Sequence, residues 1–229
     1  MLLINGREIK LAIFDMDGLL LDSERIYSEI WRETAKLLGY EMSYSQWYGL
    51  LGTNEETERQ YLYSIYGADC PTDDFRAVRL RIIDEYSDKH GFPIKKGVNE
   101  ILSFLHENDV PAVVATSSER KRAKKLLERS GIIRLFSDIT CGNEVALGKP
   151  DPALFLKAAR KAETKPEKCV VFEDSENGIK AAVRAGMAAV CVPDIQPPTE
   201  YVKEIATVLR SLDEFTVTAT TTDNKHTAS

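Results

Sequence analysis

The sequence lacks the cysteine and histidine spacings of a zinc protein or a disulfide-rich protein. Its 229 residues include four cysteines and three histidines, and no two cysteines form a C-x-x-C pair. A zinc centre or a disulfide framework is therefore excluded as the basis of the fold. Cys169 and Cys191 lie in apolar runs, where a free thiol behaves as a small hydrophobic side chain. We therefore expect a reduced, cytoplasmic protein.

Long hydrophobic runs and an excess of positive charge are also missing. No apolar stretch approaches the roughly 20 residues that a membrane span needs. The N-terminus mixes charged and apolar residues too early for a secretory signal. The formal net charge of −6 disfavours a general role on nucleic acid or on a membrane surface. We expect a monomer whose partner is a small molecule.

What the sequence does contain is an alternation of short apolar runs with helical patterns. Strands are predicted at 9–14, 110–115, 169–173 and 188–192, each mostly apolar and followed by turn residues. Amphipathic helices are predicted between the later strands. This pattern is typical of an α/β fold, a doubly wound parallel sheet with a Rossmann-like core and helices on both faces.

One long stretch breaks the alternation. Between residues 23 and 91 no strand pattern occurs, and three amphipathic helices are predicted instead. Seven of the nine tyrosines lie between positions 27 and 66 of the chain. We interpret the stretch as a helical domain inserted into the α/β core. The predicted organisation is a core formed by 1–22 and 92–213, a helical cap formed by 23–91, and a polar tail at 214–229.

Polar side chains follow three of the predicted strands, and a fourth group lies in a loop before a helix. In open α/β sheets, ligands bind beyond the carboxyl ends of the strands. These groups are up to 159 positions apart in the chain, yet the topology should gather them into one site. They are Asp15 and Asp17; Thr116, Ser117 and Ser118; Lys149; and Glu173 and Asp174.

Each group also has a purely structural interpretation. Asp15 and Asp17 could be ordinary loop residues after a strand, and a single lysine such as Lys149 is most often solvated. Thr116-Ser117-Ser118 could be the N-cap of a helix that starts near residue 119. Glu173-Asp174-Ser175 could be a helix start with Ser175 as its N-cap. The joint placement of all four groups at strand ends or in the loops beside them favours a functional site.

These residues carry a resemblance to a known family. Asp15-Met16-Asp17-Gly18, Thr116 at its strand end, Gly148-Lys149-Pro150 and Phe172-Glu173-Asp174-Ser175 resemble the four motifs of the haloacid dehalogenase superfamily, in its order and at its spacings. The helical insertion and the run 17–24 look like the subfamily of β-phosphoglucomutase and sugar phosphatases. The resemblance covers roughly residues 10–212.

The resemblance implies a role for each residue and a requirement for Mg²⁺. Asp15 would be the nucleophile that forms an aspartyl-phosphate, and Asp17 the general acid and base. Lys149 and Thr116 would stabilise the phosphoryl oxygens. The metal ligands would be Asp15, Asp174 and the backbone carbonyl of Asp17, with Glu173 favoured as a residue that holds the ligands in place. The substrate-binding candidates are Glu24, Trp47, Gly52, Thr53, Ser117 and Ser118.

Differences from related patterns favour hydrolysis of a small phosphomonoester, such as a sugar or polyol phosphate. True haloacid dehalogenases lack the second aspartate, and phosphonate-cleaving relatives need a cap lysine, which is absent between Lys36 and Lys89. A β-phosphoglucomutase-type mutase stays the main alternative. However, its cap Arg is not found in the acidic stretch 53–56, and Tyr27 replaces its His. A non-catalytic phosphate-binding protein is the alternative of another class, and Asp17 together with the cap argues against it.

Overall fold

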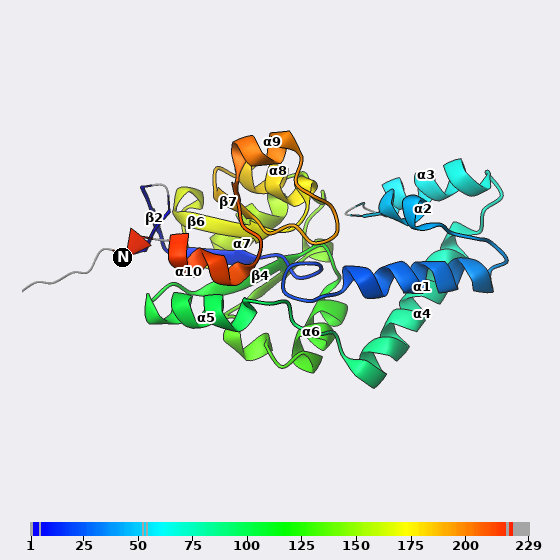
Figure 1. Cartoon of the computed structure of the whole chain (residues 1–229), viewed down its shortest axis with the longest axis horizontal. Helices are drawn as coiled ribbons and strands as arrows, with labels where there is room; N and C mark the ends of the chain where they lie inside the picture. Colours follow the sequence, from blue (N-terminus) through cyan, green and yellow to red (C-terminus); the bar gives the residue numbers. More distant parts are fainter. Residues whose placement is uncertain (1, 5, 52, 54, 219, 222–229) are drawn as a thin grey trace, which may run out of the picture. The chain divides into compact units, whose positions relative to one another are not determined.

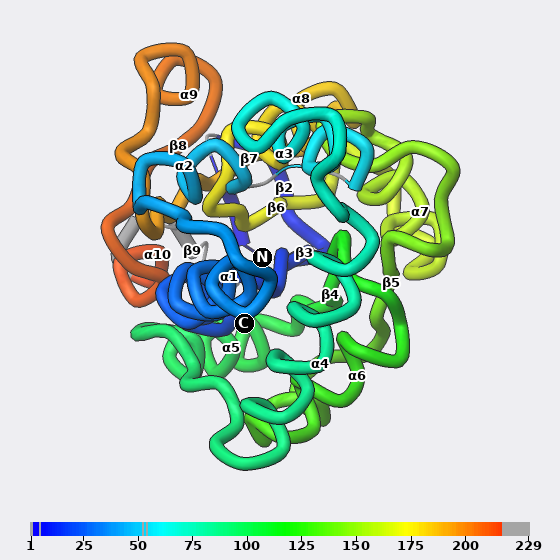
Figure 2. Tube along the Cα trace, turned by 90° about the vertical axis from the view of Figure 1, so that its right-hand side faces the viewer, coloured from blue at the N-terminus to red at the C-terminus, as the bar shows by residue number. Residues whose placement is uncertain are grey.

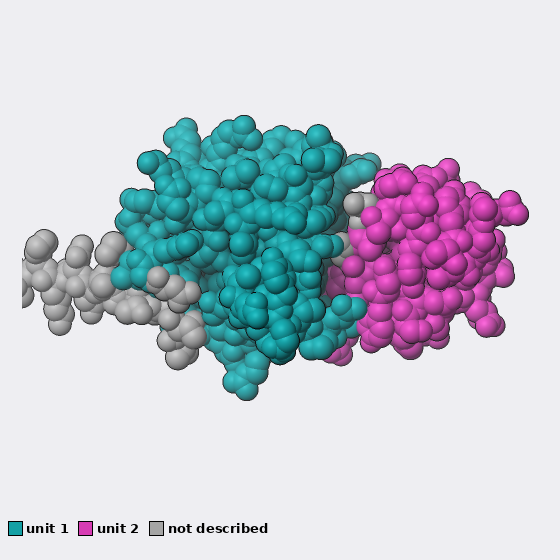
Figure 3. All heavy atoms as spheres, turned by 90° about the horizontal axis from the view of Figure 1, so that it is seen from above, with its two compact units in different colours: residues 1–21, 94–229 teal, residues 22–93 magenta. Residues whose placement is uncertain are grey.

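The computed structural model describes residues 2–4, 6–51, 53, 55–218 and 220–221. Two compact units divide the chain: residues up to 21 together with those from 94 onward, and residues 22–93 between them (Figure 3). Leu21 and Ile94 pair in an isolated antiparallel bridge. The chain therefore leaves the first unit and returns to it at neighbouring points.

The first unit is built on a six-stranded sheet in which every described strand pair is parallel. Its strands, in sheet order, are β5 (Ile139–Cys141), β4 (Ala112–Thr116), β3 (Leu11–Phe14), β6 (Cys169–Glu173), β7 (Ala188–Cys191) and β8 (Thr207–Val208). The labels in Figure 2 follow the same order from β5 to β7. The chain enters this sheet in its middle at β3 and then adds β4 and β5 on one side. It crosses to the other side of β3 with β6, followed by β7 and β8. The predicted doubly wound α/β fold is confirmed.

Helices cover both faces of this sheet, as Figure 1 shows, with α5 and α6 on one side and α7, α8 and α9 on the other. Four strands are buried at every position and consist mostly of apolar residues: β3, β4, β5 and β6. The helices of the unit are α5 (Val98–Glu107), α6 (Arg120–Arg129), α7 (Ala153–Lys161), α8 (Glu176–Arg184), α9 (Glu200–Ile205) and α10 (Phe215–Thr218), with short 3-10 turns η1 (Ile133–Leu135), η2 (Gly142–Glu144), η3 (Pro166–Lys168) and η4 (Leu212–Glu214).

Side chains alternate between two cores, one on each face. Ile13 and Val171 point into a cluster with α7 and α8, where Phe155 and Ile179 are fully buried. Phe14 and Phe172 point to the opposite face and stack on each other, with ring centroids 4.6 Å apart. These aromatic and aliphatic layers hold the carboxyl ends of β3 and β6 side by side.

The second unit consists of helices, and within its described residues there is no strand. They are α1 (Glu24–Leu37), α2 (Tyr44–Tyr48), α3 (Glu55–Tyr66) and α4 (Thr72–His90). The sequence predicted three of them. The missed helix, α2, is only five residues long, and a capping box at Ser43 starts it. Trp31 and Phe75 lie in the interior of this unit with ring centroids 6.4 Å apart.

Several predicted boundaries need correction. The first predicted strand began at Ile9, but that residue ends β2 (Arg7–Ile9), which pairs antiparallel with β1 (Leu2–Ile4) in a separate small sheet with β9 (Thr220–Thr221). The predicted polar tail began at 214, but Phe215 is buried against Phe172, with ring centroids 4.8 Å apart. The first part of that segment therefore belongs to the core, and residues 222–229 lie outside the described residues.

Among the described residues, no helix combines the length and the apolar character needed to cross a lipid bilayer.

Candidate active site

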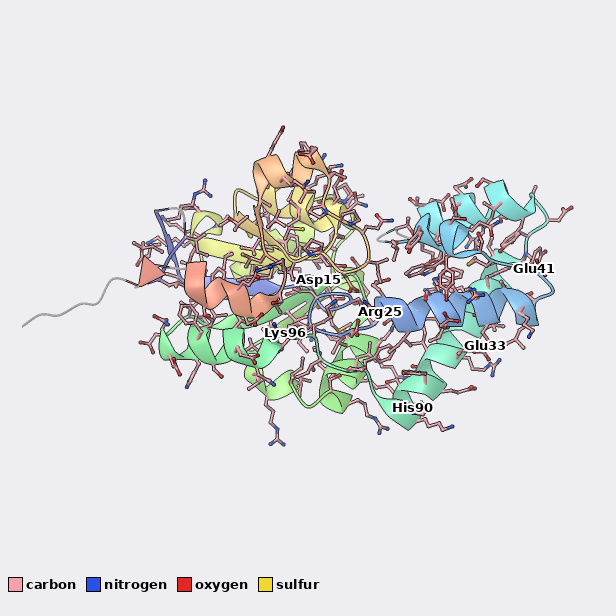
Figure 4. All side chains as sticks on the ribbon, viewed as in Figure 1. Asp15, Arg25, Glu33, Glu41, His90 and Lys96 are labelled. Carbon is pink, nitrogen blue, oxygen red and sulfur yellow. The ribbon has the colours of Figure 1, made fainter. Side chains whose placement is uncertain are left out.

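The register of the central strands brings the predicted site residues to one edge of the sheet. Phe14 at the end of β3 is paired with Val114 on one side and Phe172 on the other. Asp15 follows directly, and its backbone N–H donates to the Phe172 carbonyl over 3.0 Å. Figure 4 labels Asp15 in the first unit, where β3 ends. This edge lies where the strand order reverses, which is the usual ligand position in such sheets.

A buried cluster of two carboxylates and one ammonium group forms the centre of the site. The Lys149 ammonium donates to Glu173 Oε1 over 2.6 Å and also to Asp15 Oδ1. The side chains of Lys149, Asp15 and Glu173 are 8%, 9% and 1% exposed. Lys149 Nζ also lies 5.1 Å from the centre of the Phe155 ring. Removing these charges from water is costly, so each one needs its partners.

The electrostatics of the cluster follow from this burial. Burial raises the pKa of Asp15 to about 7, although Lys149 acts in the opposite direction. Burial alone would lower the pKa of Lys149, but Asp15 and Glu173 outweigh that effect and raise the Lys149 pKa above its ordinary value. Lys149 is therefore positively charged at neutral pH. With a pKa of about 7, the Asp15 carboxyl is present in both its protonated and its ionised form at neutral pH.

A second contact group joins the loop after β3 to the loop after β4. The Ser118 hydroxyl donates to Asp17 Oδ2 over 3.0 Å, and the Ser118 backbone N–H donates to Thr116 Oγ1 over 3.1 Å. Thr116 is the buried last residue of β4. Gly142 packs so closely that a Cβ there would lie 2.2 Å from the Ser117 carbonyl oxygen. Asp17 therefore has a defined partner separate from the Lys149 cluster.

Three acidic residues of the site could hold a metal ion. Asp15, Glu173 and Asp174 each offer a carboxylate oxygen, and these oxygens lie within 4.8 Å of one another. An all-oxygen set of anionic ligands fits a hard cation such as Mg²⁺. Both oxygens of Glu173 already accept hydrogen bonds within the protein.

One functional contact was not predicted from the sequence. Ser175, expected only as an N-cap, also donates to Glu173 Oε2 from its backbone N–H and its hydroxyl, over 2.8 and 2.9 Å. Gly178 stands in the first turn of the same helix, and a Cβ there would lie 1.9 Å from the Glu173 carboxyl. Glycine is a poor helix former, so its presence in a first turn was the available signal of a close approach.

The remaining substrate-binding candidates belong to the second unit. Glu24 begins α1, and Trp47 is buried in α2 beside Tyr48. The Thr53 hydroxyl donates to the Leu50 carbonyl over 2.8 Å, and Gly52 lies outside the described residues. A role of these four residues in substrate binding stays a prediction.

The fold and the site define a class of protein: an α/β protein with a Rossmann-like core that carries clustered carboxylates and a lysine at the carboxyl ends of its central strands. Comparison with known proteins identifies the family. The profile of the haloacid dehalogenase-like hydrolases matches residues 9–186. The chain belongs to this family, as the resemblance of its motifs predicted.

Relatives of known name agree with this assignment. A Drosophila melanogaster protein named "Probable pseudouridine-5'-phosphatase" is 33% identical over 215 residues, which cover 91% of this chain and 92% of the relative. The "Phosphorylated carbohydrates phosphatase" of Thermotoga maritima is 32% identical over 181 residues, covering 78% and 82%. The crystal structure of CbbY from Rhodobacter sphaeroides in complex with phosphate aligns with a TM-score of 0.79 at 25% identity, covering 90% and 96%. The protein is thus an enzyme of the phosphatase type, a hydrolase of phosphoric monoesters.

Proposed function

We propose that the protein hydrolyses a small phosphomonoester, of the sugar or polyol phosphate class, in a Mg²⁺-dependent reaction through an aspartyl-phosphate on Asp15. The observation that carries this proposal is the buried contact of Lys149 with Asp15 and Glu173 at the strand ends. The named activities of the phosphatase relatives support the substrate class. The expected cytoplasmic location and monomeric state are part of the proposal.

In the first step, Asp15 Oδ attacks phosphorus, and the bond from phosphorus to the ester oxygen breaks. The leaving alkoxide takes a proton from the Asp17 carboxyl, so the alcohol departs neutral and Asp17 becomes anionic. The Ser118 hydroxyl donates to Asp17 Oδ2 and would hold this side chain during the transfer. General acid catalysis of this kind contributes about 10²- to 10⁴-fold in rate.

In the second step, the anionic Asp17 takes a proton from water, and this water attacks the phosphorus of the aspartyl-phosphate. The bond between phosphorus and Asp15 breaks, which regenerates the carboxylate and releases inorganic phosphate. Lys149 would donate to the phosphoryl oxygens as negative charge shifts among them. The Thr116 hydroxyl and the backbone N–H groups at Ser117 and Ser118 would complete this cradle.

Asp15, Asp174 and the Asp17 carbonyl would hold the metal, with Glu173 keeping Lys149 in place. When bound, Mg²⁺ supplies positive charge that offsets the repulsion between the attacking carboxylate and the phosphate oxygens. The substrate specificity would lie in the helical unit acting as a cap, with Glu24, Trp47, Gly52 and Thr53 as its candidates.

The test is phosphate release from a panel of phosphomonoesters with Mg²⁺, using the native chain, Asp15→Asn and Asp17→Asn. Asp15→Asn should abolish turnover because no nucleophile remains, whereas Asp17→Asn should lower kcat by about 10²- to 10⁴-fold. Trapping of labelled phosphate on the native chain, and not on Asp15→Asn, checks the intermediate. Native-like activity of Asp15→Asn contradicts the mechanism, and conversion of β-glucose 1-phosphate to glucose 6-phosphate without phosphate release contradicts the hydrolysis.

A further inference from the structure

The carboxylate of Glu173 is held from two sides in a single orientation. Its Oε2 accepts from the Ser175 backbone N–H and the Ser175 hydroxyl, over 2.8 and 2.9 Å. Its Oε1 accepts from Lys149 over 2.6 Å. Glu173 is 1% exposed, so water does not compete for these positions. The orientation of the Lys149 ammonium toward Asp15 therefore depends on how Ser175 holds Glu173.

Ser175 also begins helix α8, and its hydroxyl serves both purposes at once. The hydroxyl oxygen accepts from the Gly178 backbone N–H over 3.1 Å, which is the N-cap contact of α8. Its single proton goes to Glu173. The start of the helix and the direction of the carboxylate are thus joined through one side chain.

Gly178 provides the space that this arrangement needs. A Cβ at this position would lie 1.9 Å from both Glu173 Cδ and Oε1, and 2.4 Å from Oε2. The group that would have to move is the end of the Glu173 side chain, and the backbone could stay in place. An added methyl group at Gly178 would thus displace the carboxylate that Lys149 contacts, while alanine favours the helix itself.

We propose that Ser175 and Gly178 are positioning residues that fix the Glu173 carboxylate and thereby direct the Lys149 ammonium at Asp15. Neither touches the reacting atoms; both act through Glu173. The kinetic consequence rests on the proposed phosphatase function, whereas the structural consequence does not. Partners that orient catalytic groups from outside typically contribute about 10- to 100-fold in activity or metal affinity.

The matched control is Thr199, which makes the same pair of contacts at another helix. Its hydroxyl donates to Glu176 Oε2 over 2.7 Å and accepts from the Val202 backbone N–H over 3.3 Å, as the N-cap of α9. Thr199→Ala removes a cap and a carboxylate contact without touching Glu173. A loss of stability alone should therefore appear in Thr199→Ala as well as in Ser175→Ala.

The experiment compares Gly178→Ala, Ser175→Ala, Ser175→Thr and Thr199→Ala in full-length protein, by kcat, KM, urea midpoint and crystal structure. We expect kcat to fall about 100-fold in Gly178→Ala and about 10-fold in Ser175→Ala, with smaller changes in KM. The urea midpoint of Gly178→Ala should fall, because the displaced Glu173 carboxylate loses buried contacts, so kcat is measured without urea, where the variant is folded. Ser175→Thr, which keeps the donor and the cap, and Thr199→Ala should keep the native kcat. The Gly178→Ala crystal structure should show the Lys149 contact with Asp15 broken.

Three results would overturn the proposal. They are native kcat in both Gly178→Ala and Ser175→Ala, an equal loss of kcat in Thr199→Ala, or an unchanged Lys149 contact in the Gly178→Ala crystal structure. An inactive native chain would contradict the phosphatase function, and the crystal structures would still decide the positioning role.

Discussion

The two units of the molecule differ in how deeply their described ion pairs are buried. In the α/β unit, Lys149, Asp15 and Glu173 are nearly fully buried in mutual contact. In the helical unit, ion pairs such as Arg81–Glu85 lie at the surface, with side chains 57% and 63% exposed. Surface pairs contribute little to stability, whereas buried charges are costly and depend strongly on their partners. The most deeply buried charge cluster thus lies at the strand ends of the α/β unit, whereas the described ion pairs of the helical unit are more exposed.

The largest effect is expected from Lys149→Met, which removes the buried cation and keeps the side-chain volume. Asp15 and Glu173 would then face each other without a positive partner. We expect a loss of about 3–5 kcal/mol in the free energy of unfolding at pH 8, measured by urea denaturation. The loss should shrink as the pH falls, because protonation of Asp15 removes the repulsion. A loss below about 1 kcal/mol would contradict the view that this lysine balances two buried carboxylates.

The next effect is the pH dependence of Mg²⁺ binding. Burial raises the pKa of Asp15 to about 7, so the folded protein holds a proton there over a range in which an ordinary Asp is ionised. In the proposed site the metal would bind the ionised carboxylate and displace that proton. Affinity should therefore rise about tenfold per pH unit between about 5 and 7 and level off above 7. Calorimetry across this range checks the sign, and an affinity that is constant or falls with pH contradicts it.

An intermediate case lies inside the helical unit and sharpens the comparison. The pair Arg79–Glu58 has side chains only 15% and 14% exposed, at 2.7 Å, and the Arg79 guanidinium lies 3.9 Å from the centre of the Trp31 ring. Arg79→Met should lower the free energy of unfolding by about 1–2 kcal/mol, through loss of the ion pair and the ring contact.

The matched control for Arg79 is Arg81→Met on the same helix, which should change stability by less than about 0.5 kcal/mol. Urea denaturation of both variants measures the difference. Equal effects at the two positions would show that burial does not separate the two kinds of pair.

The fold was predictable where burial gives the sequence a strong pattern. The strand Cys169–Glu173 was predicted with its observed bounds because both of its faces are covered and four apolar residues lead to Glu173. The three-residue strand Ile139–Cys141 was missed because so short a run carries no pattern. The strand predicted from Val110 begins at Ala112, since the Val110 N–H bonds back to the preceding helix at Leu105.

The site was predictable to the extent that topology determines it. Strand ends on one edge of a parallel sheet must meet, so the proximity of Asp15 and Glu173 followed from the strands alone. The direction of individual hydrogen bonds could not be predicted from the strands. Ser175 could be identified as an N-cap from its position, but its donation to Glu173 depends on side-chain orientation, which is set by packing around Gly178.

The bridge between Leu21 and Ile94 has a consequence for how such an enzyme can vary. Residues 22–93 leave and rejoin the first unit next to the paired residues Leu21 and Ile94. A segment of different length could therefore replace them without moving the strands that carry the carboxylates. The cost of closing such a loop grows only slowly with its length. With the proposed role of the helical unit in specificity, a chimaera that exchanges residues 22–93 with those of a relative should keep the reaction and change the substrate.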